Sequence, residues 1–344
     1  MSRLWAFSAL PLFAAAAISF GLLVLLRPVL AKYAVARPNS RSSHKQPTPQ
    51  GGGIAVIVAV LVVAGVAFSI VPSEASLIQL VGVFGATILL ALVGVTDDAF
   101  PLDPLPRLAL QAVAVIVLLA TLPIELRVMP VMPWWIERLL LFVAGIWFIN
   151  LVNFMDGIDW MSVAEVIPIS AALAILGLMG ALPMEATIVA LALCGAMIGF
   201  APLNKPVAQV FLGDVGSLPI GLLLGWLLLS LAGNGHLAAA LLLPLYYVAD
   251  TTITLLRRLV RGDPITQAHR AHFYQRAMDN RFSVYQIVGR VFGVNFALAI
   301  LAAATLASQS AVVHVSLLLT GGAIVGLLLW NFERWSGSPF SRRS

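Results

Sequence analysis

The residues of this chain best suited to chemistry are five aspartates at the ends of long apolar segments. They form three short clusters: Asp97 with Asp98, Asp156 with Asp159, and Asp214 alone. A carboxylate at the centre of a bilayer costs roughly 2.5–3.5 kcal/mol even on the more permissive insertion scale. We therefore expect all five at a membrane–water boundary. If they share one side, their oxygens form a site suited to Mg²⁺ and phosphates.

The adjacent pair Asp97 and Asp98 follows an apolar run and precedes Pro101. Neighbouring carboxylates repel each other, so such a pair is favoured where a cation or a proton relay compensates it. One member could coordinate Mg²⁺ while the other orders a substrate or accepts a proton. The alternative is a pair of solvated turn residues at the end of a helix.

A second cluster places a polar residue at every third position: Asn150, Asn153, Asp156 and Asp159. On a helical turn this spacing puts the side chains on one stripe. The two amides stand at the end of an apolar segment, where they would be costly unless they line a polar cavity. We therefore interpret the stripe as part of a site. Asp159 could also cap the next helix, after a turn that Gly157 permits.

Asp214 lies in the segment Gly213-Asp-Val-Gly-Ser217, where a loop becomes a helix. Backbone N–H groups at a helix N-terminus attract phosphate, and glycine lets a ligand approach closely. An ordinary aspartate cap between glycine spacers is the alternative. The run Gly51–Gly53 likewise has two interpretations, close backbone packing or a phosphate-binding loop.

Histidine and arginine gather in a later polar loop at His269, Arg270 and His272. These side chains offer hydrogen-bond donors to diphosphate oxygens. A zinc site at the two histidines is conceivable, but the carboxylates expected on the same face favour Mg²⁺ over Zn²⁺.

Two further residues have structural interpretations. The single cysteine, Cys194, lies inside an apolar run and excludes a disulfide framework. Asp250 precedes Arg257 and Arg258 by about two helical turns, so we expect it to pair with them.

The composition of the chain is that of a membrane protein. Hydrophobic residues make up 60% and charged residues 10% of the sequence, and the mean hydropathy is +0.99. These values exclude an ordinary soluble domain, and about 20 apolar residues are enough for a helix to span a membrane. We predict an all-α, polytopic protein with a single transmembrane domain over residues 1–344. Its eleven apolar runs are 4–29, 53–71, 77–95, 108–124, 138–152, 161–181, 186–203, 215–232, 237–256, 285–306 and 311–332.

Lys and Arg predict the orientation of these helices. Of the 20 Lys and Arg residues, all but Arg3, Arg127 and Arg138 fall in loops or helix ends on the C-terminal side. By the positive-inside rule, the C-terminus is cytoplasmic and the N-terminus periplasmic. The same alternation places all three aspartate clusters on the cytoplasmic side of the inner membrane. The net charge of +5 then belongs to a face that attracts anionic lipids, not to a nucleic-acid-binding surface.

Taken together, these motifs resemble those of the polyprenyl-phosphate N-acetylhexosamine-1-phosphate transferase superfamily, glycosyltransferase family 4. The family's aspartate pair falls on Asp97 and Asp98, and its Mg²⁺-binding aspartate falls on Asp214. Its Asn-x-x-Asn-x-x-Asp-Gly-x-Asp signature falls on residues 150–159, and its histidine loop on residues 269–272.

Two features distinguish the chain within that family. Trp160 stands where glycine is common, next to the last signature aspartate. The loop reads His-Arg-Ala-His, which is similar to the branch that initiates O-antigen and related lipopolysaccharide glycans and argues against a peptide-bearing MurNAc substrate.

The resemblance implies a transfer from a UDP-N-acetylhexosamine to undecaprenyl phosphate at the cytoplasmic leaflet, with UMP released. It implies catalytic roles for Asp97, Asp98, Asp156 and Asp159, with Mg²⁺, or Mn²⁺ in its place, bound by Asp214. Substrate contacts are expected from Asn150, Asn153, His269, Arg270, His272, Ser43 and His44. Membrane lipids and a second copy of the chain, in a homodimer, are the other expected partners.

Two other classes of protein could carry acids in membrane helices. A secondary transporter places them near the bilayer midplane, on broken helices within internal repeats. A membrane phosphatase on the same lipid would share the acids but use water as the nucleophile. A requirement for a UDP-sugar separates the transferase from both.

Overall fold

The computed structural model describes residues 2–36, 47–70, 77–263 and 270–334, and almost all of its regular structure is helical. Two short strands, β1 (Val35–Ala36) and β2 (Thr48–Pro49), pair antiparallel with Val35 opposite Pro49. The helices are α1 (Ser2–Tyr33), α2 (Gly53–Ile70), α3 (Leu77–Ala99), α4 (Pro104–Thr121), α5 (Trp134–Met155), α6 (Met161–Leu178), α7 (Met184–Asn204), α8 (Asp214–Gly233), α9 (Leu237–Leu242), α10 (Leu245–Arg261), α11 (Phe273–Asp279), α12 (Val284–Thr305) and α13 (Ala311–Arg334).

Ten of the described helices are long and apolar enough to cross a membrane, which confirms the all-α, polytopic class. The apolar run 237–256, predicted as one helix, is instead broken between α9 and α10. Proline ends a helix because it has no N–H and its ring blocks the preceding turn, and Pro244 lies at this break. The prediction of one continuous helix there was therefore wrong. The short run 138–152 extends in the structure to α5, which has 22 residues.

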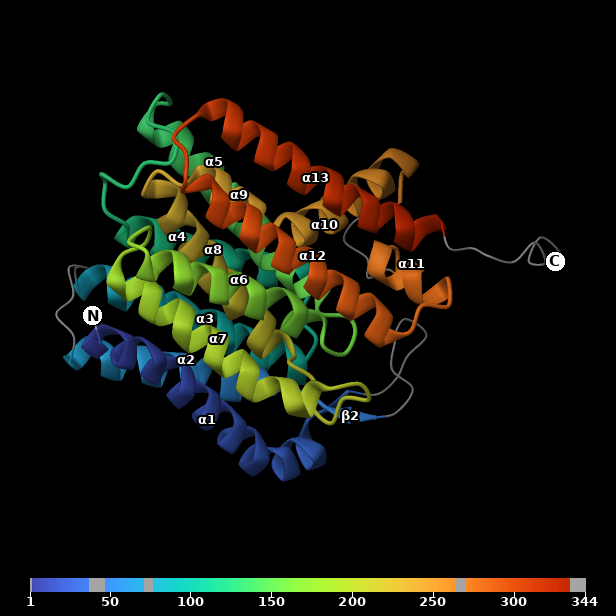
Figure 1. Cartoon of the computed structure of the whole chain (residues 1–344). Helices are drawn as coiled ribbons and strands as arrows, with labels where there is room; N and C mark the ends of the chain where they lie inside the picture. The colour runs from blue at the N-terminus through green and yellow to red at the C-terminus, as the bar shows by residue number, and fades with distance from the viewer. Residues whose placement is uncertain (1, 37–46, 71–76, 264–269, 335–344) are drawn as a thin grey trace.

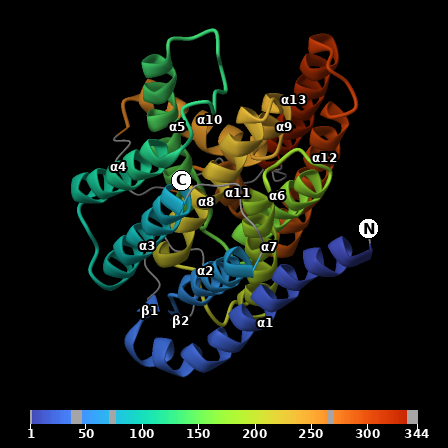
Figure 2. The ribbon, with the colours of Figure 1, turned by 90° about the vertical axis from the view of Figure 1, so that its left-hand side faces the viewer.

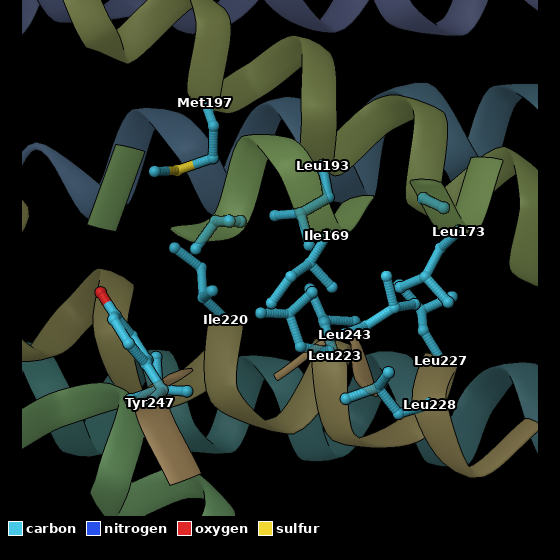
Figure 3. Packing of buried hydrophobic residues seen from close by; sticks show 14 of the residues in the cluster. Ile169, Leu173, Leu193, Met197, Ile220, Leu223, Leu227, Leu228, Leu243 and Tyr247 are labelled. Carbon is cyan, nitrogen blue, oxygen red and sulfur yellow. The ribbon is translucent and has the colours of Figure 1, made fainter. Parts of the chain in front are cut away.

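Helix α8 forms the centre of the bundle. It packs against α2, α3, α5 and α9, and these helices surround it when the bundle is viewed end-on (Figure 2). Large aliphatic side chains interdigitate around it in Figure 3, among them Ile169, Leu173, Leu193, Met197, Ile220, Leu223 and Leu227. Because lipid tails are as apolar as leucine, close packing more than escape from water holds such helices together.

The ends of α2 and α8 approach each other unusually closely. A Cβ at Gly53 would overlap the backbone of Gly216. The N–H of Gly53 donates to the Leu212 carbonyl at 2.8 Å, and the N–H of Gly52 donates to the Phe211 carbonyl at 2.8 Å. Close packing is thus the interpretation of the glycine run that the structure supports, because these amides bind other parts of the chain.

The first and last described helices begin and finish at opposite ends of the bundle. Helix α1 starts at one end and α13 finishes at the other (Figure 1). This arrangement agrees with termini on opposite sides of a membrane. Which side faces the cytoplasm stays a prediction.

Candidate active site

The carboxylate of Asp98 lies at the N-terminus of α8. Its oxygens accept hydrogen bonds from the backbone N–H groups of Asp214, at 2.9 Å, and Val215, at 3.2 Å. The side-chain amide of Gln50, next to β2, donates to the same carboxylate. The N–H groups of Gly216 and Ser217 bond to the Gly213 carbonyl. The first turn of α8 therefore meets an anion from within the protein, at the place where the sequence suggested a phosphate.

Arg107 joins two of the carboxylates. Its guanidinium lies 2.9 Å from Asp97 and 3.7 Å from Asp214. The second oxygen of Asp97 accepts the Leu102 N–H at 2.6 Å, which fixes the turn after α3. Positive charge between two carboxylates offsets their repulsion. The solvated-turn alternative for Asp97 is thus replaced by a role in holding Arg107 and that turn.

Asn153 also holds Asp214. Its amide donates to the Asp214 carboxylate at 2.8 Å and to the Ser217 hydroxyl at 2.9 Å. Asn150, one turn earlier on α5, does not join this group. It donates instead to the buried Gln111 of α4 at 2.6 Å. The stripe predicted from the sequence therefore divides, with Asn153 in the site and Asn150 in helix packing.

Asp156 follows the last residue of α5 and accepts the Ser162 hydroxyl at 2.5 Å. Burial, together with the neighbouring carboxylates of Asp98 and Asp159, raises the pKa of Asp156 to about 6. Proximity of like charges has this effect because each disfavours ionisation of the other. Asp156 is therefore electrostatically part of the same group as Asp98.

Asp159 ties down the loop between α7 and α8. Its carboxylate accepts the Ala208 N–H at 3.0 Å. The suggestion that it caps the next helix was wrong, because the N-cap of α6 is Trp160. Gly157 also has a role besides the turn expected of it. A Cβ there would overlap the hydroxyl of Tyr274, so glycine is needed for this close approach rather than for the turn alone.

His272 is buried against Asp250, with 3.1 Å between its Nδ1 and the carboxylate. The same carboxylate accepts the N–H groups of Phe273, at 3.1 Å, and Tyr274, at 3.4 Å, at the start of α11. The expected pairing of Asp250 with arginine was wrong, since Arg257 pairs with Glu333 at 2.8 Å. Asp250 anchors the histidine loop instead.

Arg270 lies at the surface of that loop and is 3.6 Å from Asp279. It is the described residue of the predicted loop that is most accessible to a substrate, because the His272 ring is enclosed. Ser43, His44 and His269, which were also expected to contact substrate, lie outside the residues that the structure describes.

The residues present fit Mg²⁺ by their chemistry. Hard carboxylate oxygens from α3, the α5–α6 turn and α8 converge here, with Asp214 among them. In the described ranges, no group of three or more His, Cys, Asp or Glu side chains is arranged as a metal cage. Mg²⁺ is commonly bound by one or two carboxylates together with substrate phosphates, so this arrangement is compatible with it.

Arg107 and Gln50 were not recognised from the sequence as site residues. Arg107 counted only as one positive charge on the cytoplasmic side, and its position at the start of an apolar helix gave no partner. Gln50 precedes the glycine run, and only the glycines of that segment suggested a role. The pairs Gln50 with Asp98 and Arg107 with Asp214 join segments far apart in the chain, and a single sequence carries no signal for such pairs.

Several curated proteins are similar to this chain. Residues 80–232, which carry all five aspartates, match the sequence model of glycosyl transferase family 4. A probable undecaprenyl-phosphate N-acetylglucosaminyl 1-phosphate transferase of Bacillus subtilis (strain 168) is 27% identical over 282 residues, 76% of this chain and 76% of that protein. A decaprenyl-phosphate N-acetylglucosaminephosphotransferase of Mycolicibacterium smegmatis is 28% identical over 278 residues, 71% of this chain and 68% of that protein. A phospho-N-acetylmuramoyl-pentapeptide-transferase of Streptococcus pneumoniae (strain CGSP14) is 30% identical over 228 residues, 62% of this chain and 68% of that protein.

The chain belongs to glycosyl transferase family 4. The resemblance noted from its motifs is thereby confirmed, and this member of the family is a multi-pass membrane transferase. Its matched segment runs from α3 to the end of α8, so the family core coincides with the helices that bring the aspartates together. The roles assigned to individual residues stay predictions.

Proposed function

We propose that this glycosyl transferase transfers N-acetylhexosamine 1-phosphate from a UDP-sugar to undecaprenyl phosphate at the cytoplasmic face of the inner membrane. An oxygen of the lipid phosphate attacks the sugar-bearing phosphorus of the donor. A new P–O bond forms, the bond to the other phosphate breaks, and UMP leaves. The observation that carries this proposal is the convergence of Asp98, Asp156 and Asp214, with Arg107, at one end of an apolar bundle.

Both substrates are anionic, so the site must offset repulsion between their phosphates. We infer that Asp214 holds Mg²⁺, kept in position by Asn153 and by the α8 turn that Asp98 caps. When bound, Mg²⁺ (or Mn²⁺) supplies positive charge to the diphosphate and to the leaving UMP. Arg107 adds a second positive charge beside Asp214. Preorganised charge of this kind stabilises a transition state without reorganisation during the reaction.

The remaining acids have roles at the two phosphates in this proposal. Asp97 or Asp98 orders or deprotonates the lipid phosphate, and Asp156 and Asp159 order the metal or the nucleotide. Arg270 provides a donor at the rim. The His-Arg-Ala-His loop supports a product that initiates an O-antigen or related lipopolysaccharide glycan. The names of the Bacillus and Mycolicibacterium relatives make UDP-N-acetylglucosamine the first donor to test.

An apolar cavity beside the acids supports a proposal for where the lipid tail of the acceptor binds. An apolar cavity of about 250 Å³ lies between α4, α5, α8, α9 and α10. Its lining includes Ile149 and Gly221, each one helical turn from a polar residue of the site, Asn153 and Ser217 respectively. It continues along α8 to Ala232, about 16 Å at the helical rise per residue. We propose that the polyprenyl chain binds in this groove with its phosphate toward Asp214.

The test is product formation by the purified protein in detergent with undecaprenyl phosphate, Mg²⁺ and a panel of UDP-N-acetylhexosamines. Mass spectrometry should detect a sugar-diphosphate lipid, and its mass identifies the sugar. Release of inorganic phosphate from the lipid without any UDP-sugar would instead indicate a phosphatase. Folded protein without either product, but with substrate flux into liposomes, would indicate a transporter.

A further inference from the structure

Trp160 occupies a backbone conformation that residues other than glycine rarely adopt. Its φ is 62° and its ψ is 3°, in the left-handed region, directly before α6. A bulky residue there is uncommon because its Cβ crowds the backbone. Glycine is the residue this conformation favours, so the tryptophan must be retained by its contacts.

Those contacts join three elements around the loop 205–213, which connects α7 to α8. The Trp160 backbone N–H donates to the Asn204 side chain at 2.8 Å, and its indole N–H donates to the Ala201 carbonyl at 2.7 Å. Its ring meets Tyr285 of α12 edge-on, with 6.1 Å between ring centroids. The Tyr285 hydroxyl donates to the Pro206 carbonyl at 2.8 Å.

The same loop is connected to the acids at two places, near its middle and at its end. Asp159, the residue before Trp160, accepts the Ala208 N–H at 3.0 Å. The loop then leads through Gly213 into Asp214, the proposed metal ligand. Trp160 and Tyr285 therefore fix the beginning of a loop whose last residue, Gly213, precedes Asp214.

We propose that Trp160 is a positioning residue that holds the loop 205–213 in the shape needed to bind the nucleotide-sugar donor. This inference rests on the proposed transferase function. The loop serves the donor because the lipid groove takes its lining from α4, α5, α8, α9 and α10 and the segment before α5, whereas Trp160 is held by α7 and α12. Preorganising a binding loop lowers the ordering cost of binding and so lowers the KM of the ligand it serves.

Trp160→Gly is the direct test, because glycine retains the backbone conformation while removing the ring and the indole N–H. We expect the KM for the UDP-sugar to rise about tenfold, and the KM for undecaprenyl phosphate and kcat to change by less than about twofold. Trp160→Phe keeps a ring against Tyr285 and should fall between wild type and Trp160→Gly. Trp135→Gly removes an exposed tryptophan at the start of α5 and should leave both KM values unchanged.

Hydrogen exchange at the Ala208 amide gives a second readout that does not require activity. It should accelerate in Trp160→Gly and, to a smaller extent, in Tyr285→Phe, because both loosen the loop. Unchanged exchange in Trp160→Gly would overturn the inference, as would an equal rise in both KM values. Wild-type protein that forms no sugar lipid would contradict the proposed function instead, and the exchange result would still decide whether Trp160 holds the loop.

Discussion

Asp98 and Asp214 are 116 residues apart in the chain, yet the carboxylate of the first accepts the backbone N–H of the second at 2.9 Å. The N-terminus of a helix carries a partial positive charge, and an anion placed there is stabilising. Asp98 thus sets the position of the turn from which the Asp214 side chain projects. In this arrangement the aspartate pair and the Gly-Asp motif, separate in the sequence, form one structural unit.

Asp98→Asn should reduce both activity and stability. Asp98 accepts hydrogen bonds at both oxygens, whereas asparagine has one acceptor oxygen and would turn its NH2 toward a backbone N–H of α8, so we expect a loss of about 1–2 kcal/mol in unfolding free energy. Turnover should fall more than about a hundredfold, because the proposed metal ligand moves with the turn. Thermal melting and UMP release measure the two effects. Asp103→Asn is the matched control, since this exposed acid makes no side-chain cap to α4. Equal behaviour of the two variants would contradict the assignment.

Asp214→Asn should abolish turnover while leaving the fold intact. The asparagine can still accept from Asn153 but binds a divalent cation far more weakly. UMP release measured across a range of Mg²⁺ concentrations should stay near background. Near-normal activity, or recovery to wild-type rates at high Mg²⁺, would rule out Asp214 as the principal metal ligand.

The helical class and the convergence of the aspartates could be predicted because both depend on local patterns. Apolar runs predict spanning helices, and acids at their ends predict a shared boundary. The break at Pro244 was not predicted because apolar residues continue on both sides of the proline, and together they indicated one helix over 237–256. The partners of Asp98, Asp250 and Asn150 were not predictable, since each contacts a residue more than 20 positions away.

The rate should depend on pH through Asp156. Its pKa is raised from 3.8 to about 6 by burial, so it gains a proton as pH falls through 6. If the ionised form is required, kcat/KM should fall about tenfold per pH unit below 6 and level off above it.

The stability of the protein depends on the same carboxyl in the opposite direction. The contribution of Asp156 to the unfolding free energy is fully present below pH 3.8 and is lost as pH rises through 6.

The pH dependence of Asp156→Asn separates this carboxyl from its neighbours. The variant should be slow at every pH, and its kcat/KM should no longer fall as pH drops through 6. If the variant keeps near-wild-type rates and the same fall near pH 6, another group titrates there.

Gly157→Ala should displace α11 from the site. The new methyl group overlaps the Tyr274 hydroxyl, which donates to the Phe154 carbonyl at 3.3 Å. Overpacking of this kind costs about 1–3 kcal/mol. Adding Tyr274→Phe should restore part of the lost stability and activity, because it removes the overlapping oxygen. The nearest ring atom to the new methyl carbon is then Cζ, at 3.1 Å. Thermal melting of both single variants and the double variant measures the rescue, and strictly additive losses would contradict the contact.

Filling the apolar groove should affect the lipid substrate alone. Ala144 lines the groove on α5, so Ala144→Trp should raise the KM for undecaprenyl phosphate about tenfold and leave the KM for the UDP-sugar nearly unchanged. Val143 is exposed on the same helix but does not line the groove, and Val143→Trp is the control. Equal kinetics for the two variants would place the lipid tail elsewhere.

The most direct test of the central claim is UMP release by the purified protein with each component omitted in turn. Complete mixtures contain UDP-N-acetylglucosamine or another UDP-N-acetylhexosamine, undecaprenyl phosphate and Mg²⁺. We predict UMP release only in the complete mixture, and none from Asp214→Asn under the same conditions. UMP released without the lipid, or at an equal rate from Asp214→Asn, would contradict a sugar-phosphate transfer carried out at this cluster of aspartates.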